Sequence, residues 1–430
     1  MITLLDRVKC FARTYAVLLG CVFVATSIAL LFALRNHERS RQQSLSFKTP
    51  DTIVRIRERP LQAIVYPFAF SRSITPAALE RAMNVARPRF KLKRLPVPLV
   101  LHALRLWGSN TKCQVLTVDS NKPSWTDGPK LADILLNDKS FVGNSSYVMQ
   151  HYLERSRWGI QVATDAELRE SGARAASHVG KFHDTMARIG MSSSTRLYLH
   201  DGTTATLGDA IVDEAVRYHV DGEIEWSSQA LFSYVSSSRW VDRYGQVVDK
   251  ERIVLNLLDK DLGTGSCHGM HVPMALATAL NIHGQMPFLS SSTVNLVRSR
   301  LQSYARLLES SQDNDGSWKP LWYAKNSSTD HGGVYKHPLV RQLDVVGHHM
   351  EWLIICPPEL RPHDHVLNRS VMFIINRMPE IDDTVLNDWH HYLPISHAAR
   401  VLRVAFIDVM CKSGTDLVKL DASLLGSAKE

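Results

Sequence analysis

Apolar positions recur every three or four residues through most of the chain after residue 75, whereas strict two-residue alternation is scarce. A period near 3.6 residues is typical of helices that bury one face, and turns rich in Gly, Pro, Asp and Asn separate the segments. Only residues 196–200 indicate a short strand. The pattern predicts helices over residues 77–86, 99–107, 145–157, 166–189, 207–218, 227–235, 250–259, 271–280, 292–310, 345–355, 363–376 and 395–409.

Residues 15–34 follow a different pattern, because they form an uncharged run of 20 residues, YAVLLGCVFVATSIALLFAL. At about 1.5 Å per residue, a helix of this length spans the hydrocarbon core of a bilayer. A cleaved signal peptide has a shorter apolar core, followed by small residues at the cleavage site. The run therefore predicts a retained single-pass anchor whose partner is the lipid bilayer. Basic residues flank both ends, so orientation is not fixed by charge; the extracytoplasmic side is favoured for the rest of the chain.

The chain accordingly divides into a tail (1–14), the transmembrane anchor (15–34), a polar juxtamembrane linker (35–60) and one helical domain (61–430). Short amphipathic helices joined by polar turns indicate helical hairpins stacked in two layers. The expected fold class is all-α, with the anchor followed by an array of these hairpins.

Composition supports a globular domain with a substantial core, because 45% of the 430 residues are hydrophobic and 21% are charged. The formal charge of +8 favours anionic partners. However, the densest basic run, residues 87–94, is interrupted by Pro88 and Phe90 and follows the anchor. A solvated or lipid-facing surface explains it better than nucleic-acid binding. The six cysteines include no C-x-x-C pair and do not form a disulfide framework.

One motif indicates a particular helical architecture. Residues 307–318 read LLESSQDNDGSW and end in the pattern Q-x-x-D-G-S-W. A helix ending near Gln312, a turn through Asp315 and Gly316, and a Trp318 ring packed on the glutamine amide would fasten the helix end to the next segment. The motif resembles the QW repeat of squalene and terpene cyclases, whose fold is shared by protein prenyltransferase subunits. The resemblance implies an α/α toroid, with inner and outer rings of helices around a central cavity.

A second motif offers candidate metal ligands. Residues 263–271 read GTGSCHGMH and lead into the helix expected at 271–280. Thiolate and imidazole are good zinc ligands, so Cys267, His268 and His271 are candidate ligands and zinc is the candidate cofactor. The alternative is a buried cysteine with hydrogen-bonded histidines that shape a turn, which is the default for such residues.

The Cys-His-Gly tripeptide resembles the zinc-binding segment of lanthionine-forming cyclases, another α/α-toroid family. That resemblance implies a further cysteine some tens of residues upstream, but the nearest upstream cysteine is Cys113. Protein prenyltransferases use an Asp-x-Cys pair, whereas Gly265 stands two residues before Cys267. His331, His348 and His349 are possible distant ligands, and the sequence does not choose among them.

An acidic motif, EIDDT at residues 380–384, resembles the D-x-D-D-T motif of class II terpene cyclases with glutamate in the first position. That resemblance implies that Asp382, beside Asp383, is a protonated catalytic acid. The alternative, which we prefer, is that Asp382 or Asp383 caps the helix that begins at Thr384.

The remaining histidines carry no signature of their own. His348 and Glu351 are three residues apart and would share a helix face, but the H-E-x-x-H motif of zinc proteases is absent. His390, His391 and His397 form another cluster, for which a structural role is the default. The sequence also lacks a G-x-S-x-G nucleophile motif, a P-loop and a dinucleotide fingerprint.

Two hypotheses for function follow. In the first, a membrane-anchored α/α-toroid-like domain binds an unidentified ligand or protein partner in a central cavity. In the second, it is an enzyme of the toroid superfamily that modifies an isoprenoid or a peptide at a Cys/His metal site. The enzyme hypothesis requires Cys267, a histidine and a carboxylate to converge in a water-accessible cavity, whereas the binding hypothesis expects them to be scattered or buried among apolar groups.

Overall fold

The structure is a computed structural model. It describes residues 54–66, 68, 74–90, 95–119, 122–139, 151–163, 178, 180–220, 222–264, 267–323, 335, 337–386 and 388–406. The chain divides into two compact units: Met1–Thr52 with Arg243–Gln246, and Ile53–Asp242 with Val247–Glu430. The second unit contains all of the described helices and strands. It is mostly helical, as the sequence predicts.

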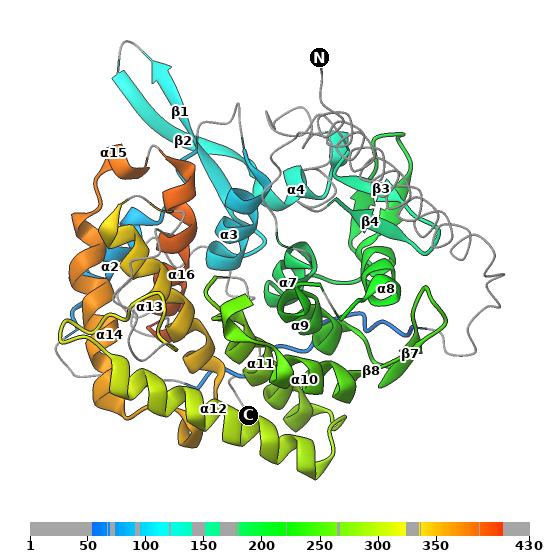
Figure 1. The fold of residues 1–430 in the computed structure, drawn as a ribbon. Coiled ribbons are helices and arrows are strands. Elements are labelled where there is room, and N and C mark those ends of the chain that lie inside the picture. The colour runs from blue at the N-terminus through cyan, green and yellow to red at the C-terminus, as the bar shows by residue number, and fades with distance from the viewer. Residues whose placement is uncertain are drawn as a thin grey trace, which may run out of the picture. The chain divides into compact units, whose positions relative to one another are not determined.

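Six helices of this unit pack in a closed ring (Figure 1). Around the ring, each helix contacts the next, and the last contacts the first. Every residue of the ring helices Val97–Trp107 and Ile224–Tyr234 is buried, as expected for helices covered on all sides. In ring order the helices are α3 (Val97–Trp107), α7 (Lys181–Arg188), α9 (Ile224–Tyr234), α11 (His271–Gln285), α13 (Pro338–Ile355) and α16 (Trp389–Ala405).

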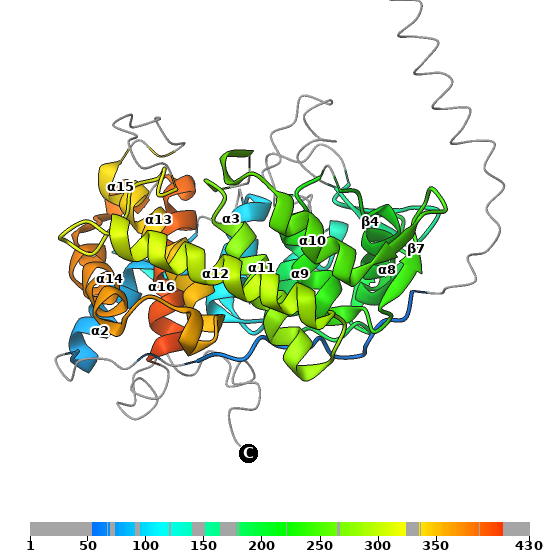
Figure 2. The ribbon, with the colours of Figure 1, turned by 60° about the horizontal axis from the view of Figure 1, so that its bottom comes forward.

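A second set of helices packs against the ring, and from α7 to α14 the chain alternates between the two sets (Figure 2). The longest of them, α12 (Ser291–Ser311), buries a single stripe that includes Val297, Leu301 and Leu308. This spacing is the one-faced apolar period that predicted the helix. The other members are α2 (Pro76–Val85), α8 (Leu207–Arg217), α10 (Lys250–Asp259) and α14 (Asp364–Arg377).

Short antiparallel hairpins connect the helices. The described strands form four two-stranded sheets: β1 (Lys112–Asp119) with β2 (Lys122–Lys130), β3 (Leu153–Arg155) with β4 (Ile160–Val162), β5 (Arg196–Tyr198) with β6 (Thr204–Thr206), and β7 (Arg239–Val241) with β8 (Val247–Asp249). The strand expected at 196–200 is β5. The helix expected at 145–157 is wrong for its last residues, because Leu153–Arg155 pairs with β4. Short elements complete the unit: α4 (Leu131–Leu135), α15 (Asp383–Leu386) and three 3₁₀ turns.

The chain between residues 54 and 66 runs along the helical unit. Arg57 N donates to Tyr234 O at 2.8 Å, and Tyr66 N donates to Ile354 O at 2.9 Å. The end of the expected 35–60 linker therefore packs on the domain. The expected anchor at 15–34 lies outside the described residues. Among the residues that the structure does describe, no helix is long and apolar enough to cross a membrane.

Candidate metal centre

Cys267 lies in a turn that leads directly into α11. Cys267, His268 and Gly269 all have left-handed backbone conformations, with φ of 48°, 55° and 72°. Such values are uncommon for residues with a side chain and carry a cost on the order of 1 kcal/mol each. At Gly269 a Cβ would lie 2.5 Å from the carbonyl oxygen of Leu262, so the turn requires glycine there. This strained turn places the thiol beside the N-terminus of α11.

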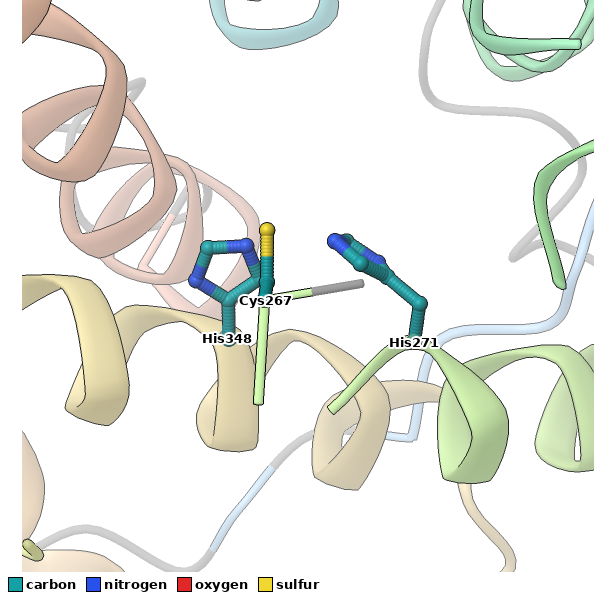
Figure 3. Close-up of side chains that lie close together, drawn as sticks. All are labelled: Cys267, His271 and His348. Carbon is teal, nitrogen blue, oxygen red and sulfur yellow. The ribbon is translucent and has the colours of Figure 1, made fainter. Parts of the chain in front are cut away.

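The turn brings the sulfur to two imidazole rings (Figure 3). One nitrogen from His271, the first residue of α11, and one from His348 on α13 lie with Cys267 Sγ in a group whose members are all within 4.8 Å of one another. His268 is not in this group; its backbone carbonyl accepts a hydrogen bond from Trp322 Nε1 at 3.2 Å. The structure therefore brings two of the three candidate ligands, Cys267 and His271, together with His348, one of the possible distant ligands.

Both ring nitrogens of His271 are buried without a hydrogen-bond partner, and Nε2 of His348 has no partner other than the Cys267 sulfur. The two residues are 0% and 1% exposed. Leaving a buried polar atom unpaired typically costs about 1–3 kcal/mol. Such atoms in a native protein call for an explanation such as an ion.

Neighbouring polar groups orient His348 and the sulfur. His348 Nδ1 lies 2.7 Å from the Asp344 carbonyl oxygen and 3.3 Å from its Oδ1, which leaves Nε2 on the side of Cys267. His178 also hydrogen-bonds Cys267, and its Nδ1 lies 2.9 Å from Glu223 Oε1. A carboxylate behind the imidazole is the usual second layer of a metal site.

Electrostatics favour an ionised thiol and a neutral His271. Burial raises the pKa of the Cys267 thiol, but the charge on His348 and the hydrogen bonds from His178 and His348 hold it at about 6. Burial and the His348 charge lower the pKa of His271 well below its ordinary value. Burial also opposes charge on His348, yet Asp344 and Cys267 raise its pKa well above the ordinary value.

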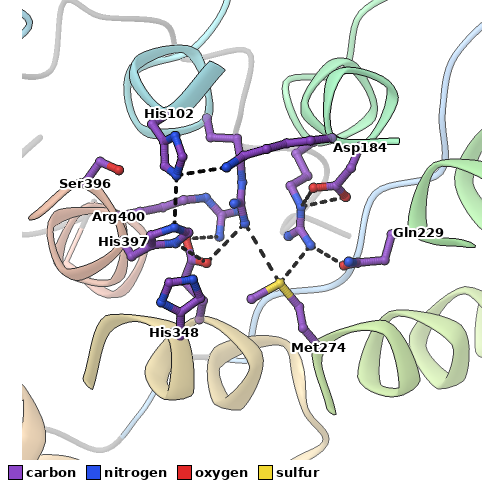
Figure 4. Close-up of polar contacts among 12 residues, drawn as sticks. His102, Asp184, Gln229, Met274, His348, Ser396, His397 and Arg400 are labelled. Carbon is purple, nitrogen blue, oxygen red and sulfur yellow. Dashed lines mark hydrogen bonds and ion pairs between the residues drawn. The ribbon is translucent and has the colours of Figure 1, made fainter. Parts of the chain in front are cut away.

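The space inside the ring is polar, in contrast to an ordinary helical core (Figure 4). Every ring helix contributes buried or nearly buried polar side chains to it, many of them bonded to one another. Buried charges are rare in proteins unless they are paired or functional. The set comprises His102 and Arg105 on α3, Lys181, Asp184 and Arg188 on α7, Gln229 on α9, His271 on α11, His348 and Glu351 on α13, and His397 and Arg400 on α16.

Glu351 is the centre of this network. One of its oxygens lies 3.1 Å from Arg105 Nη2 and 2.9 Å from His397 Nδ1, and the other lies 3.3 Å from Arg400 Nη1. Burial raises the pKa of Glu351, but Arg105 and His397 hold it well below the usual range. Its cationic partners Arg105 and Arg400 keep it ionised. One turn earlier on α13, the ring of His348 lies 3.8 Å, centre to centre, from the ring of His397 on α16, so the network adjoins the candidate ligand group.

The acidic motif is a helix cap. Asp382 Oδ1 accepts hydrogen bonds from Thr384 N at 2.9 Å and Val385 N at 3.0 Å, at the start of α15. A third hydrogen bond, from the Thr384 hydroxyl, has the largest effect on Asp382, and together the three lower its pKa. A catalytic acid needs a raised pKa. Asp382 and Asp383 are both exposed. Asp382 thus caps the start of α15, as in the alternative that we prefer, and its surroundings do not favour the protonated form that the implied catalytic role requires.

The Q-x-x-D-G-S-W segment forms the tight turn that its sequence predicts. Asp315 Oδ1 accepts from Ser317 N at 2.9 Å, and Gly316 has φ of 93°. Trp318 is buried and donates to Leu308 O at 2.9 Å. The Gln312 amide donates instead to Val366 O and Ser370 Oγ of α14, and to Gly316 O. The turn thus joins the end of α12 to α14.

Of the other histidines named from the sequence, His397 lies against His348, whereas His349, His390 and His391 have other neighbours. His331 lies outside the described residues. His349 is buried against the rings of Trp318 and Trp322, with ring centres 5.3 and 4.7 Å away. His390 and His391 bond locally, to Asp388 and to the Val385 carbonyl.

A second group of possible ligands lies among the hairpins. Asp138 is buried, and its Oδ2 lies 2.9 Å from His151 Nδ1 and 3.9 Å from His200 Nδ1. Its other oxygen already accepts from the backbone N–H groups of Tyr152 and Leu153. That carboxylate is occupied in holding the loop to β3, and His200 is exposed.

The sequence reasoning did not identify Arg105, Lys181, Asp344 or Arg400. The sequence around Arg105 does carry a signal of a polar site: the segment VPLVLHALRLW is apolar on all sides except for His102 and Arg105, which are three residues apart. A helix that is apolar all round is buried, so a polar pair on one of its faces must point at a partner or a site.

No family model, no curated protein and no solved structure matches this chain.

Proposed function

We propose that the helical domain is a zinc-dependent enzyme whose ion is held by Cys267, His271 and His348. The observation that supports it is the convergence of the Cys267 sulfur with buried imidazole nitrogens that have no other partner. Cys267, a histidine and the Asp344 carboxylate lie together, and this convergence is one part of what the enzyme hypothesis requires. We also propose that the closed ring with its second layer is α/α-toroid-like, and that residues 15–34 anchor it in a membrane.

The composition of the ligand set favours a catalytic ion over a structural one. Structural zinc sites use four protein ligands, whereas catalytic sites use three and leave one position open. A thiolate with two imidazoles gives three. Bound zinc supplies a Lewis acid that makes a bound water or thiol nucleophilic near neutral pH.

The protein residues have defined tasks in this proposal. Asp344 fixes the ring orientation of His348 and leaves Nε2 toward the sulfur. His178, backed by Glu223, hydrogen-bonds Cys267 and can exchange a proton with a bound group.

Metal analysis of purified protein tests the proposal. The protein prepared without chelators should contain about one zinc per chain, the stoichiometry of a mononuclear site. Cys267→Ser and His348→Ala should each remove most of the zinc. Cys356→Ala is the matched control, because Cys356 is also a buried free thiol but lies at the end of α13, away from the group. A native protein that takes up no zinc on reconstitution would refute the proposal.

A second function is favoured by the strained turn. Cys267 has φ of 48°, precedes a helix of 15 residues and lies next to a histidine backed by a carboxylate, which is also the arrangement of a cysteine nucleophile. Alkylation of Cys267 by iodoacetamide separates the two functions. A thiolate held by zinc should react slowly and become fast after chelation, whereas a free nucleophile should react at one rate with or without chelator.

A further inference from the structure

The polar interior has more hydrogen-bond donors than acceptors. Arg105 is 4% exposed, yet its Nε and Nη1 have no partner, and the indole Nε1 of the fully buried Trp226 has none. Lys181 is 3% exposed, and its Nζ lies 3.1 Å from His102 Nε2. Among the described residues, no carboxylate lies within ion-pair distance of Lys181. The missing partner in this interior is an acceptor.

The charge in this interior is also unbalanced. Four cationic side chains face three anions, the Glu351 and Asp184 carboxylates and the ionised Cys267 thiol, and each carboxylate already has an arginine partner. An uncompensated charge in a low-dielectric interior is costly, and folded proteins tolerate it mainly where a ligand supplies the counter-charge. A metal dication with one thiolate ligand would increase the positive excess. The four cations are Arg105, Lys181, Arg188 and Arg400.

The unpaired donors lie beside the metal-ligand group and around one aromatic ring. Lys181 Nζ is 5.0 Å from the Trp226 ring centre, and Arg105 Cζ is 5.5 Å from it. The His271 ring centre is 4.0 Å from the same ring. Cation–π contact offsets part of the cost of these charges, but it uses no N–H donor. A single ligand can therefore reach both the cations and the ligand group.

We infer that this interior binds an oxyanion of the substrate, a carboxylate or a phosphate group, with Arg105 and Lys181 as donors. The inference deepens the proposed function and rests on it for the assignment of the ligand as a substrate. The anion would lie on the Trp226 side of the metal centre, where it satisfies the unpaired N–H groups and balances the charge. The substrate class is then a small anionic molecule, or the anionic end of a larger one.

Thermal unfolding in inorganic phosphate or in acetate, against chloride at equal ionic strength, tests the inference. The native protein should unfold at a higher temperature in one of the two oxyanions than in chloride, because a ligand that binds only the folded state stabilises it. The effective oxyanion identifies the group. Lys181→Met should weaken that binding about tenfold or more, as expected for the loss of a charge-assisted hydrogen bond. Lys181→Arg, which keeps the charge, should retain most of it.

Stability without the anion supplies an independent readout. In chloride, Lys181→Met should raise the unfolding temperature, because it removes a buried charge that has no carboxylate partner. Lys250→Met is the matched control: it also removes a buried lysine, but its Nζ contacts the Val235 carbonyl and lies near the Phe288 ring. That variant should be stabilised and should keep the full response to the oxyanion.

The outcomes separate this inference from the proposed function. If neither oxyanion acts beyond chloride, or if Lys181→Met responds like the native protein, the inference is overturned, whatever the zinc content. Phosphate that binds the metal directly would stabilise Lys181→Met as much as it stabilises the native protein. Such binding therefore gives the second of these results and overturns the inference. If the zinc-free Cys267→Ser variant still responds through Lys181, the anion site stands and only the metal proposal fails.

Discussion

Lys181 and Lys250 are both buried, but they are surrounded by different groups. Burial lowers the pKa of Lys181 to about 8, with Cys267 acting in the opposite direction. Burial, with the charge of Arg57, lowers the pKa of Lys250 to about 7. Lys181 lies in the polar interior beside the candidate metal centre, whereas Lys250 begins α10 and contacts only a carbonyl and an aromatic ring. Lys250 is therefore a residue whose charge affects folding alone.

Lys250 should make stability depend on pH. Its folded pKa of about 7 lies below the ordinary lysine value of about 10.4, so between these values the unfolded chain holds a proton that the folded protein has lost. Stability therefore rises with pH across that window, and the cost of burial is greatest below pH 7. Urea unfolding should show Lys250→Met more stable than the native protein at about pH 6, by about 2 kcal/mol more than at about pH 9.

The exposed Lys130 supplies the control for this experiment. Lys130→Met should change stability by the same small amount at both pH values. If the difference in stability between Lys250→Met and the native protein does not vary with pH, the lysine keeps its charge inside the fold or reaches water.

At the scale of elements, α13 and α16 are in close contact at Gly347. A Cβ built there would lie 2.6 Å from Ala398 N and 2.8 Å from His397 Cβ, which is nearer than real side chains come. Gly347 is one residue before His348, and His397 bonds Glu351. The spacing of these two helices therefore sets the position of one candidate metal ligand and of the carboxylate network.

Gly347→Ala should destabilise the protein although alanine is the better helix former. The intrinsic gain is about 1 kcal/mol, but the clash with the α16 backbone cannot be relieved by a side-chain rotation and should exceed it. Gly284→Ala in α11 is the matched control, because nothing lies within 4 Å of its added Cβ. Guanidinium unfolding should rank Gly284→Ala at or above the native protein and Gly347→Ala below it. The reverse order would show that the helices can separate freely.

The helices could be predicted from sequence because each carries its own apolar period, as α10 and α12 illustrate. The β1–β2 hairpin could not, because KPSWTDGPK in β2 contains two prolines and a glycine and lacks alternation. The sequence predicts a helix that starts after Pro394, yet α16 begins at Trp389. Proline is disfavoured inside a helix, and here the packing of α16 against α13 and α3 outweighs that cost.

Prediction of the site was limited by distance along the chain. Cys267 and His271 share one short motif, so their proximity could be read directly. His348 was one of three histidines that the sequence could not rank. Arg105 and Lys181 join the site only because the ring closes, and closure depends on the packing of helices that are far apart in sequence.

At the scale of the whole molecule, membrane anchoring by residues 15–34 can be tested independently of the fold of the helical unit. An uncharged run of this length should partition into the bilayer as a helix and resist release by high pH, which strips proteins held by charge. After alkaline carbonate extraction, the full-length protein should remain with the membrane pellet. A mature protein that begins after residue 34 and appears in the supernatant would show a cleaved signal instead.

Ring closure joins segments that are made at very different times. His102 on α3 meets His397 on α16, which is 295 residues later in the chain. At about 5–20 residues per second, roughly 15–60 seconds of synthesis separate the two. During that interval α3, which is buried along its whole length in the finished protein, can already pack on α4 and α7 but lacks α16, and until Glu351 is made Arg105 lacks its carboxylate. A nascent chain of this protein therefore exposes the apolar face of α3 that α16 later covers, and a ribosome stalled before Glu351 would hold a natural substrate for chaperones.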